Sequence, residues 1–193
     1  MSRERQIARL TGIAVELDDA ALGLLSTFAE SLHASPGTTR DLTSKALAAG
    51  FTRLGENYAQ ELRDKAAALI GPTPEWHFIG RLQTNKVRLV DRVVSLWQSV
   101  DRAALADRIA QRAPGAAVLV QVDLAGLAGR GGCPPEEVPA LVEHCRGRGL
   151  DVRGLMGVGP PGPAEDARPG FRLLTTIAED LGLEERSMGM SGD

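Results

Sequence analysis

The side chains best suited to act on a bound molecule are an imidazole and an amine that lie close together in the sequence. His77 sits inside the apolar run 76–80, and Lys86 follows shortly after it. A histidine within a buried strand can act as a general base, but the sequence favours a hydrogen-bonded core residue. An unprotonated lysine amine can attack a carbonyl group, although a solvated surface lysine is the favoured interpretation of Lys86.

Four further residues could contact a ligand. Asn57 follows a short predicted strand, where it either orients a ligand or caps the helix that begins at Tyr58. Met156 lies in another predicted strand and is expected to pack beside a pocket. Ser191 and Gly192 follow the last predicted strand, where a hydroxyl and accessible backbone N–H groups suit a phosphate. The alternative for this pair is a chain end that nothing holds in place.

Charge and hydropathy exclude several classes of protein. The 22 Lys and Arg residues against 25 Asp and Glu give a net charge of −3. With a pI of about 5.7, the chain is not expected to bind nucleic acid through phosphate contacts. No apolar run approaches the roughly 18 residues of a membrane helix. The first ten residues lack the apolar stretch of a signal peptide, so we expect a cytoplasmic protein.

The two cysteines and three histidines predict neither a disulfide framework nor a metal site. Cys145 falls on the apolar face of a predicted helix and is expected to be a buried thiol. Cys133 falls in a Gly/Pro loop and is expected to be an incidental loop thiol. A disulfide between them, or a metal held with the scattered His33, His77 and His144, is not expected.

Strand and helix signals alternate along the chain. Short apolar runs predict strands over 51–54, 76–80, 93–97, 117–122 and 152–158, and Ser187 begins one more. Helical periodicity predicts helices that begin near Asp18, Thr39, Tyr58, Thr84, Asp101 and Pro134, and a last one that carries Phe171, Leu174, Ala178 and Leu181.

This alternation predicts an α/β fold with a parallel sheet, because the strands are apolar on both faces. An open doubly wound sheet and a closed (β/α)₈ barrel both fit. No G-x-G-x-x-G or Walker-type loop is present, which disfavours dinucleotide and nucleoside-triphosphate binding. A barrel needs about 250 residues, and the seventh strand begins near Ser187. We therefore expect one TIM-barrel-like domain over residues 1–193, incomplete at its C-terminal end.

Five segments resemble the pyridoxal phosphate homeostasis proteins, small relatives of the alanine racemase N-terminal barrel. Their order and spacing match that family from about Thr39 to the end of the chain. The segments are GENYAQE at 55–61, WHFIGRLQTNK at 76–86, SVD at 99–101, GLM at 154–156 with GP at 159–160, and SMGMS at 187–191.

The resemblance implies a barrel that binds pyridoxal 5'-phosphate (PLP) through a Schiff base to a lysine at the end of the first strand. Two departures weaken that expectation. Alignment back from Gly55 places Pro36 at the lysine position, and proline has no free amine. The chain also ends before the family's last strand, whose Arg-Ile-Gly-Thr segment helps to hold the ligand. Lys45 and Lys65 are expected on helices outside the barrel, which leaves Lys86 as the sole substitute by position.

Three hypotheses follow from the resemblance. The first is a non-catalytic PLP carrier or regulator with weakened or non-covalent binding, whose site includes Asn57, His77, Met156, Ser191 and Gly192. The second is a PLP-dependent racemase or decarboxylase, which Pro36 disfavours. The third is a degenerate or truncated family member without PLP binding. Because a cut barrel exposes strand edges, we expect a monomer of marginal stability or weak self-association.

Overall fold

One seven-stranded sheet runs through the computed structural model, which describes residues 14–15, 39–127 and 131–190. Its strands follow one another in sequence order across the sheet. They are β1 (Ala14–Val15), β2 (Arg53–Glu56), β3 (Glu75–Phe78), β4 (Val94–Val100), β5 (Ala117–Val122), β6 (Asp151–Gly159) and β7 (Glu185–Met190).

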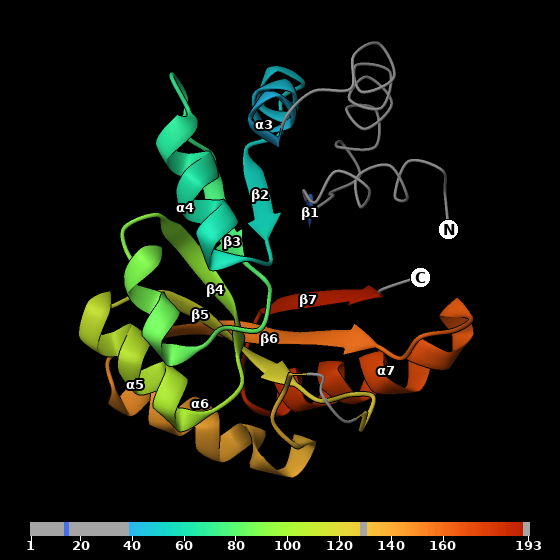
Figure 1. Cartoon of the computed structure of the whole chain (residues 1–193). Helices are drawn as coiled ribbons and strands as arrows, with labels where there is room; N and C mark the ends of the chain where they lie inside the picture. The colour runs from blue at the N-terminus through green and yellow to red at the C-terminus, as the bar shows by residue number, and fades with distance from the viewer. Residues whose placement is uncertain (1–13, 16–38, 128–130, 191–193) are drawn as a thin grey trace.

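The strands from β2 to β7 are parallel and curl into a half-barrel (Figure 1). A doubly wound sheet would reverse its strand order at a switch point, whereas this order never reverses. The barrel-like alternative is therefore confirmed. β1 was not expected from the sequence and pairs antiparallel to β2, with Ala14 opposite Gly55.

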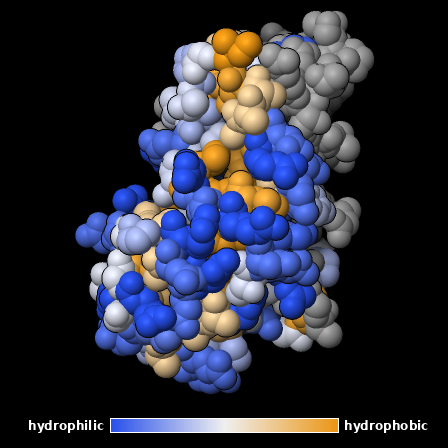
Figure 2. Space-filling view, turned by 60° about the vertical axis from the view of Figure 1, so that its left-hand side comes forward, coloured by the Kyte–Doolittle hydropathy of each residue, from blue (hydrophilic) through white to orange (hydrophobic). Residues whose placement is uncertain are grey.

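Helices cover the outer, convex side of the half-barrel (Figure 1). They are α3 (Thr39–Ala48), α4 (Ala59–Ala68), α5 (Ala103–Arg112), α6 (Val138–Gly147) and α7 (Ala164–Asp180), with the 3₁₀ turns η1 (Thr84–Leu89) and η2 (Pro135–Glu137). With these helices facing the viewer, Figure 2 shows a largely hydrophilic surface on which hydrophobic residues come through mainly in the upper half.

The main core lies between the sheet and this helix layer. Strand β5 shows how the sheet divides its side chains, because Val118, Val120 and Val122 join the outer core. The alternate residues Ala117 and Leu119 pack on the concave side. A period of two places successive side chains on opposite faces, and here both faces of the strand are buried.

Several predicted starts of helices need correction. Thr84 does not cap an α-helix, because Gln83 is the N-cap of a 3₁₀ turn. The N-cap of α5 is Arg102, and not Asp101. The segment after Pro134 begins with the 3₁₀ turn η2 before α6 follows, although the predicted apolar stripe of α6 is buried as expected. The helix expected after Asp18 lies outside the described residues.

Candidate functional site

The carboxyl ends of β2 to β7 meet at one edge of the half-barrel, which we call the carboxyl edge. Parallel strands bring the residues that follow them together at such an edge, where barrels of this kind bind ligands. Asn57 follows β2, Gly80 lies just beyond β3, Asp101 follows β4 and Asp123 follows β5. The segments that sequence analysis singled out therefore converge here, although they are far apart in the chain.

A chain of hydrogen bonds, buried between His77 and Gln98 and partly buried at Ser187, crosses the concave side just below this edge. Ser187 Oγ on β7 donates to Gln98 Oε1 on β4 at 2.7 Å. Gln98 Nε2 lies 2.8 Å from His77 Nδ1 on β3. Since the Gln98 oxygen already accepts from Ser187, its amide nitrogen is the donor to His77, whose Nδ1 is then unprotonated. His77 is thus the hydrogen-bonded buried histidine that the sequence favoured, and it faces the barrel interior.

Apolar side chains complete the concave side. Leu96, Ala117, Leu119 and Met156 form a small buried cluster, against which Val158 packs. Met156 therefore has the packing role expected for it. Its strand neighbours across the sheet are Gln121 on β5 and Ser187 on β7. The cluster shares the interior with the polar chain, so this side offers both an apolar surface and hydrogen-bonding groups.

A hollow of about 220 Å³ lies at the carboxyl edge where β5 and β6 end. Its polar wall includes Gln121, whose Nε2 donates to the carbonyl oxygen of Gly131 at 3.0 Å. Asp123 Oδ1 accepts from the backbone N–H groups of Ala125 and Gly126, which fixes the turn after β5. The full lining is Gln121, Val122, Asp123, Leu124, Ala125, Gly131 and Val158.

A larger groove of about 620 Å³ lies elsewhere, on the outer helix layer. It is lined by residues of η1 and α5 together with Arg148. Asp107 in this groove binds His144 Nε2 and Arg148 Nε, both at 2.7 Å. These interactions lower the pKa of Asp107, chiefly through the hydrogen bond from His144. None of the residues that line this groove belongs to a strand, so we place the candidate site in the smaller hollow and the adjacent barrel interior.

Cys133 is not the incidental loop thiol that the sequence predicted. Its N–H donates to the carbonyl of Gln121, and its own carbonyl accepts from Asp123, so the segment after the loop pairs with the end of β5. Burial, with smaller contributions from nearby Glu137 and Asp101, raises the pKa of Cys133 to about 12. Cys145 is buried as expected, and burial raises its pKa to about 11. Both thiols are free.

Asn57 does not cap α4, which corrects one of its two interpretations. The N-cap is Tyr58, without a side-chain capping bond. The preceding Glu56 instead accepts hydrogen bonds from the N–H groups of Asn57 and Tyr58 at 2.6 and 3.0 Å. Sequence reasoning missed Glu56, although an acidic residue between a strand and a helix start was a usable signal. The exposed side chain of Asn57 remains a candidate ligand contact.

All three lysines of the chain lie on elements of the outer layer, namely α3, α4 and η1. Lys65 was expected outside the barrel, and it is there, but it is buried against Glu56 instead of solvated. Lys86 lies on η1, which packs against α4 and α5 in the outer layer. The structure therefore does not bring Lys86 together with His77 and Met156.

Pro36, Ser191 and Gly192 lie outside the described residues. Within the described part of the chain, no group of His, Cys, Asp and Glu side chains could hold a metal ion. No helix in the described ranges is long and apolar enough to cross a membrane.

Residues 35–193 match the alanine racemase N-terminal domain family. The chain is 42% identical over 157 residues to the pyridoxal phosphate homeostasis protein of Deinococcus radiodurans, covering 79% of this chain and 73% of that protein. It is 36% identical over 200 residues to the protein of the same name from Pseudomonas aeruginosa, covering 100% and 82%. This chain belongs to the pyridoxal phosphate homeostasis protein family.

Solved structures agree with this membership. PipY of Synechococcus elongatus without PLP superposes with a TM-score of 0.72 at 27% identity, covering 79% of this chain and 85% of PipY. PipY with PLP bound superposes with a TM-score of 0.63 at 30% identity, covering 80% of this chain and 78% of that PipY chain. An alanine racemase of Clostridium difficile superposes with a TM-score of 0.62 at 14% identity. The match covers 77% of this chain and 41% of the racemase, and it shows a shared fold alone.

Proposed function

We propose that this chain binds PLP non-covalently at the carboxyl edge and serves PLP homeostasis as a carrier or regulator, without catalysing a reaction. The observation that carries the proposal is the concave side, where the hydrogen-bonded chain of His77, Gln98 and Ser187 lies beside the apolar cluster around Met156. A pyridine ring with polar substituents needs this combination of flat apolar surface and a few oriented polar groups. Relatives named for PLP homeostasis support it.

We assign five residues to the ligand in this proposal. Asn57 and His77 offer polar contacts from the β2 and β3 ends, and Met156 offers an apolar one from β6. Ser191 and Gly192, just beyond the end of β7, are the proposed phosphate contacts, because a hydroxyl and backbone N–H groups suit that anion. We leave out Lys86, since its turn packs on the outer layer.

The non-covalent mode follows from where the lysines lie. PLP, when bound, supplies an aldehyde that can condense with a nearby free amine. Lys65 is buried in an ion pair on the outer side of β2, and the elements that carry Lys45 and Lys86 also belong to the outer layer. The same placement disfavours the racemase hypothesis, because that chemistry needs a lysine at the ring. The proposal takes residues 1–193 as one domain, since a single sheet spans all described strands.

Calorimetric titration of the purified chain with PLP tests this function. We expect saturable binding, an affinity about tenfold weaker in His77→Ala, where an interior polar group is lost, and unchanged affinity in Lys86→Met. Circular dichroism first establishes that each variant is folded. Absence of saturable binding to the wild-type chain would refute the proposal, and loss of binding in Lys86→Met would refute the choice of site.

A further inference from the structure

A buried ion pair lies directly beneath the Asn57 turn. Glu56 is only 1% exposed and Lys65 only 5% exposed. Lys65 Nζ on α4 binds Glu56 Oε2 at the end of β2, and it also lies 3.3 Å from Glu61 Oε2. The Lys65 side chain runs back along α4 toward the start of the helix, the direction in which helical side chains lean. A lysine and a glutamate are rarely buried this completely unless they are paired.

The second oxygen of the same carboxylate holds the turn that carries Asn57. Glu56 Oε1 accepts from the N–H groups of both Asn57 and Tyr58, while Lys65 occupies Oε2. Each carboxylate oxygen therefore has a defined partner. The turn consequently cannot rotate without breaking a charge-assisted hydrogen bond, and such bonds are stronger than neutral ones.

Neighbouring backbone closes on this turn from β3. The N–H of Ile79 donates to the carbonyl of Glu56 at 3.0 Å. Gly80 lies so close that a Cβ atom there would stand 2.1 Å from the carbonyl oxygen of Asn57. Ser99 Oγ then donates to the carbonyl of Gly80 at 2.6 Å, which extends the contact to β4. Asn57 is thus held between a buried carboxylate and the ends of two further strands.

Helix capping alone does not explain this arrangement. A Ser, Thr, Asn or Asp at the N-cap satisfies the first amides of a helix at the surface, without burying any charge. A buried ion pair carries a desolvation penalty that often cancels its attraction. Its distinctive effect is geometric, because it fixes one turn in one orientation at the carboxyl edge.

We propose that Glu56 and Lys65 are positioning residues that orient Asn57 toward PLP. The inference rests on the proposed function, because it takes PLP as the ligand. Glu56 acts through the backbone of Asn57, and Lys65 acts by neutralising the Glu56 carboxylate. Neither side chain reaches the concave side, since Glu56 lies on the same face of β2 as the outer-core residue Leu54.

The test uses variants of the full chain that remove both charges together. In Glu56→Gln/Lys65→Met, the Gln oxygen can still accept from both amides, and no buried charge is left alone. In Glu56→Ala/Lys65→Met, the acceptor is gone. We expect the first to keep its PLP affinity within about twofold and the second to lose about tenfold, as Asn57→Ala also does.

Adding Asn57→Ala to Glu56→Ala/Lys65→Met distinguishes positioning from general destabilisation. If Glu56 acts through Asn57, the triple variant loses no more than about tenfold, because both changes remove one contact. A loss of about a hundredfold, the product of independent effects, would overturn the inference. Wild-type affinity in Glu56→Ala/Lys65→Met would overturn it as well.

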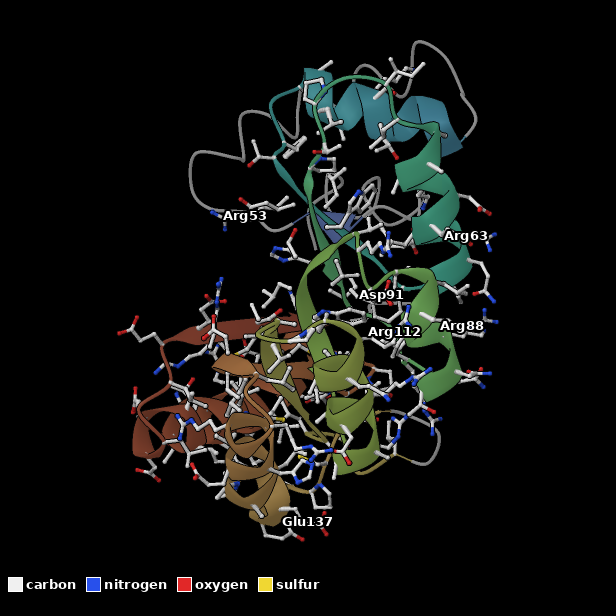
Figure 3. The ribbon with its side chains drawn as sticks, turned by 90° about the vertical axis from the view of Figure 1, so that its left-hand side faces the viewer. Arg53, Arg63, Arg88, Asp91, Arg112 and Glu137 are labelled. Atoms are coloured by element: carbon white, nitrogen blue, oxygen red, sulfur yellow. The ribbon has the colours of Figure 1, made fainter. Side chains whose placement is uncertain are left out.

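Asp91→Asn is the matched control. It breaks the ion pair between Asp91 and Arg112 Nε at 2.6 Å, which joins the segment after η1 to α5 on the outer layer (Figure 3). Asp91 is largely buried, like Glu56, but lies far from the carboxyl edge. We expect its melting temperature to fall while its PLP affinity stays unchanged. An equal loss of affinity here would mean that stability, and not positioning, governs binding.

Amide hydrogen exchange separates this inference from the proposed function. The N–H groups of Asn57 and Tyr58 should exchange slowly in the ligand-free wild type and in Glu56→Gln/Lys65→Met, and rapidly in Glu56→Ala/Lys65→Met. A wild type that binds no PLP would refute the proposed function, and with it the orientation of Asn57 toward that ligand. Slow exchange in all three proteins would overturn the positioning role itself, whether or not PLP binds.

Discussion

The two faces of the half-barrel are built on different principles. The outer side packs apolar residues from strands β2 to β6 against the helices, with Leu54, Trp97, Val120 and Leu155 fully or almost fully buried. The concave side has a smaller apolar cluster and mixes it with the buried polar residues His77, Gln98 and Gln121. Buried polar groups are costly without partners. The outer side buries its Glu56–Lys65 ion pair within an extensive apolar core that holds the fold together. On the concave side the polar groups make up a larger share, and we propose that they meet a ligand.

The largest effect should come from a deletion in the outer core. Leu105 on α5 is 0% exposed, and Leu105→Ala leaves a cavity between α5 and the sheet. We expect a loss of roughly 2–5 kcal/mol in the free energy of unfolding, measured by urea denaturation. PLP affinity of the folded fraction should be unchanged. A loss well under 1 kcal/mol would contradict the assignment of this face as the main stabilising core.

Compared with Leu105→Ala, a change on the concave side should lower the free energy of unfolding less and weaken PLP binding more. Gln98→Leu removes the bonds to His77 and Ser187, and it leaves the buried His77 and the half-buried Ser187 without that partner. We expect about 1–3 kcal/mol of destabilisation, together with weaker PLP binding in calorimetry. Leu119→Met is the matched apolar control on the same face and should cost less than about 1.5 kcal/mol. Unchanged PLP affinity in Gln98→Leu would show that the polar chain serves the fold alone.

Thiol chemistry tests burial in the outer core, to which both cysteines belong. The thiolate is the reactive form, and the pKa values of about 12 for Cys133 and about 11 for Cys145 keep it scarce at neutral pH. The pKa of Cys145 is about 11 instead of its usual 9.0, so the fraction of its thiol present as thiolate at neutral pH is about a hundredfold lower. Iodoacetamide should therefore modify both cysteines slowly in the native chain and readily in urea. Rapid native labelling of Cys133 would contradict its burial and favour the incidental loop thiol that the sequence predicted.

The smallest effect concerns pH dependence on the outer surface. The pKa of Asp107 lies below its usual 3.8, because His144 and Arg148 bind the carboxylate. A carboxyl group with a lowered pKa in the folded chain contributes stability above the unfolded pKa, and this is lost as the pH falls through the folded one. Asp107→Asn should thus melt slightly below wild type at pH 7, and the difference should vanish in acid. A difference that grows toward low pH would contradict this sign.

The outer face could largely be predicted from the sequence, and the concave face only in part. Strand 117–122 was predicted with the bounds that the structure gives it, and the stripe of α6 is buried as predicted. Hydrophobic periodicity within a short stretch of sequence is enough to predict these features. The bond from Ser187 to Gln98 joins residues 89 positions apart, and no local pattern records such a partner.

The candidate site shows the same limit. Lys65 was expected among helix residues outside the barrel, but its burial depends on Glu56, nine positions earlier and on another element. Cys133 was assigned to a loop because the pairing of its backbone with Gln121 and Asp123 is a tertiary contact. The sequence left Asn57 with two possible roles, a ligand contact or a helix cap. In the structure the amides of this turn donate to Glu56, so Asn57 is not the cap.

The central claim, non-covalent PLP binding at the carboxyl edge, is tested most directly by intact mass spectrometry after borohydride reduction of the PLP-saturated chain. Reduction makes a lysine linkage permanent and leaves a non-covalent ligand free to dialyse away. We predict saturable binding before reduction and an unmodified mass after reduction and denaturing dialysis. A stoichiometric PLP adduct on Lys45, Lys65 or Lys86 would contradict the account.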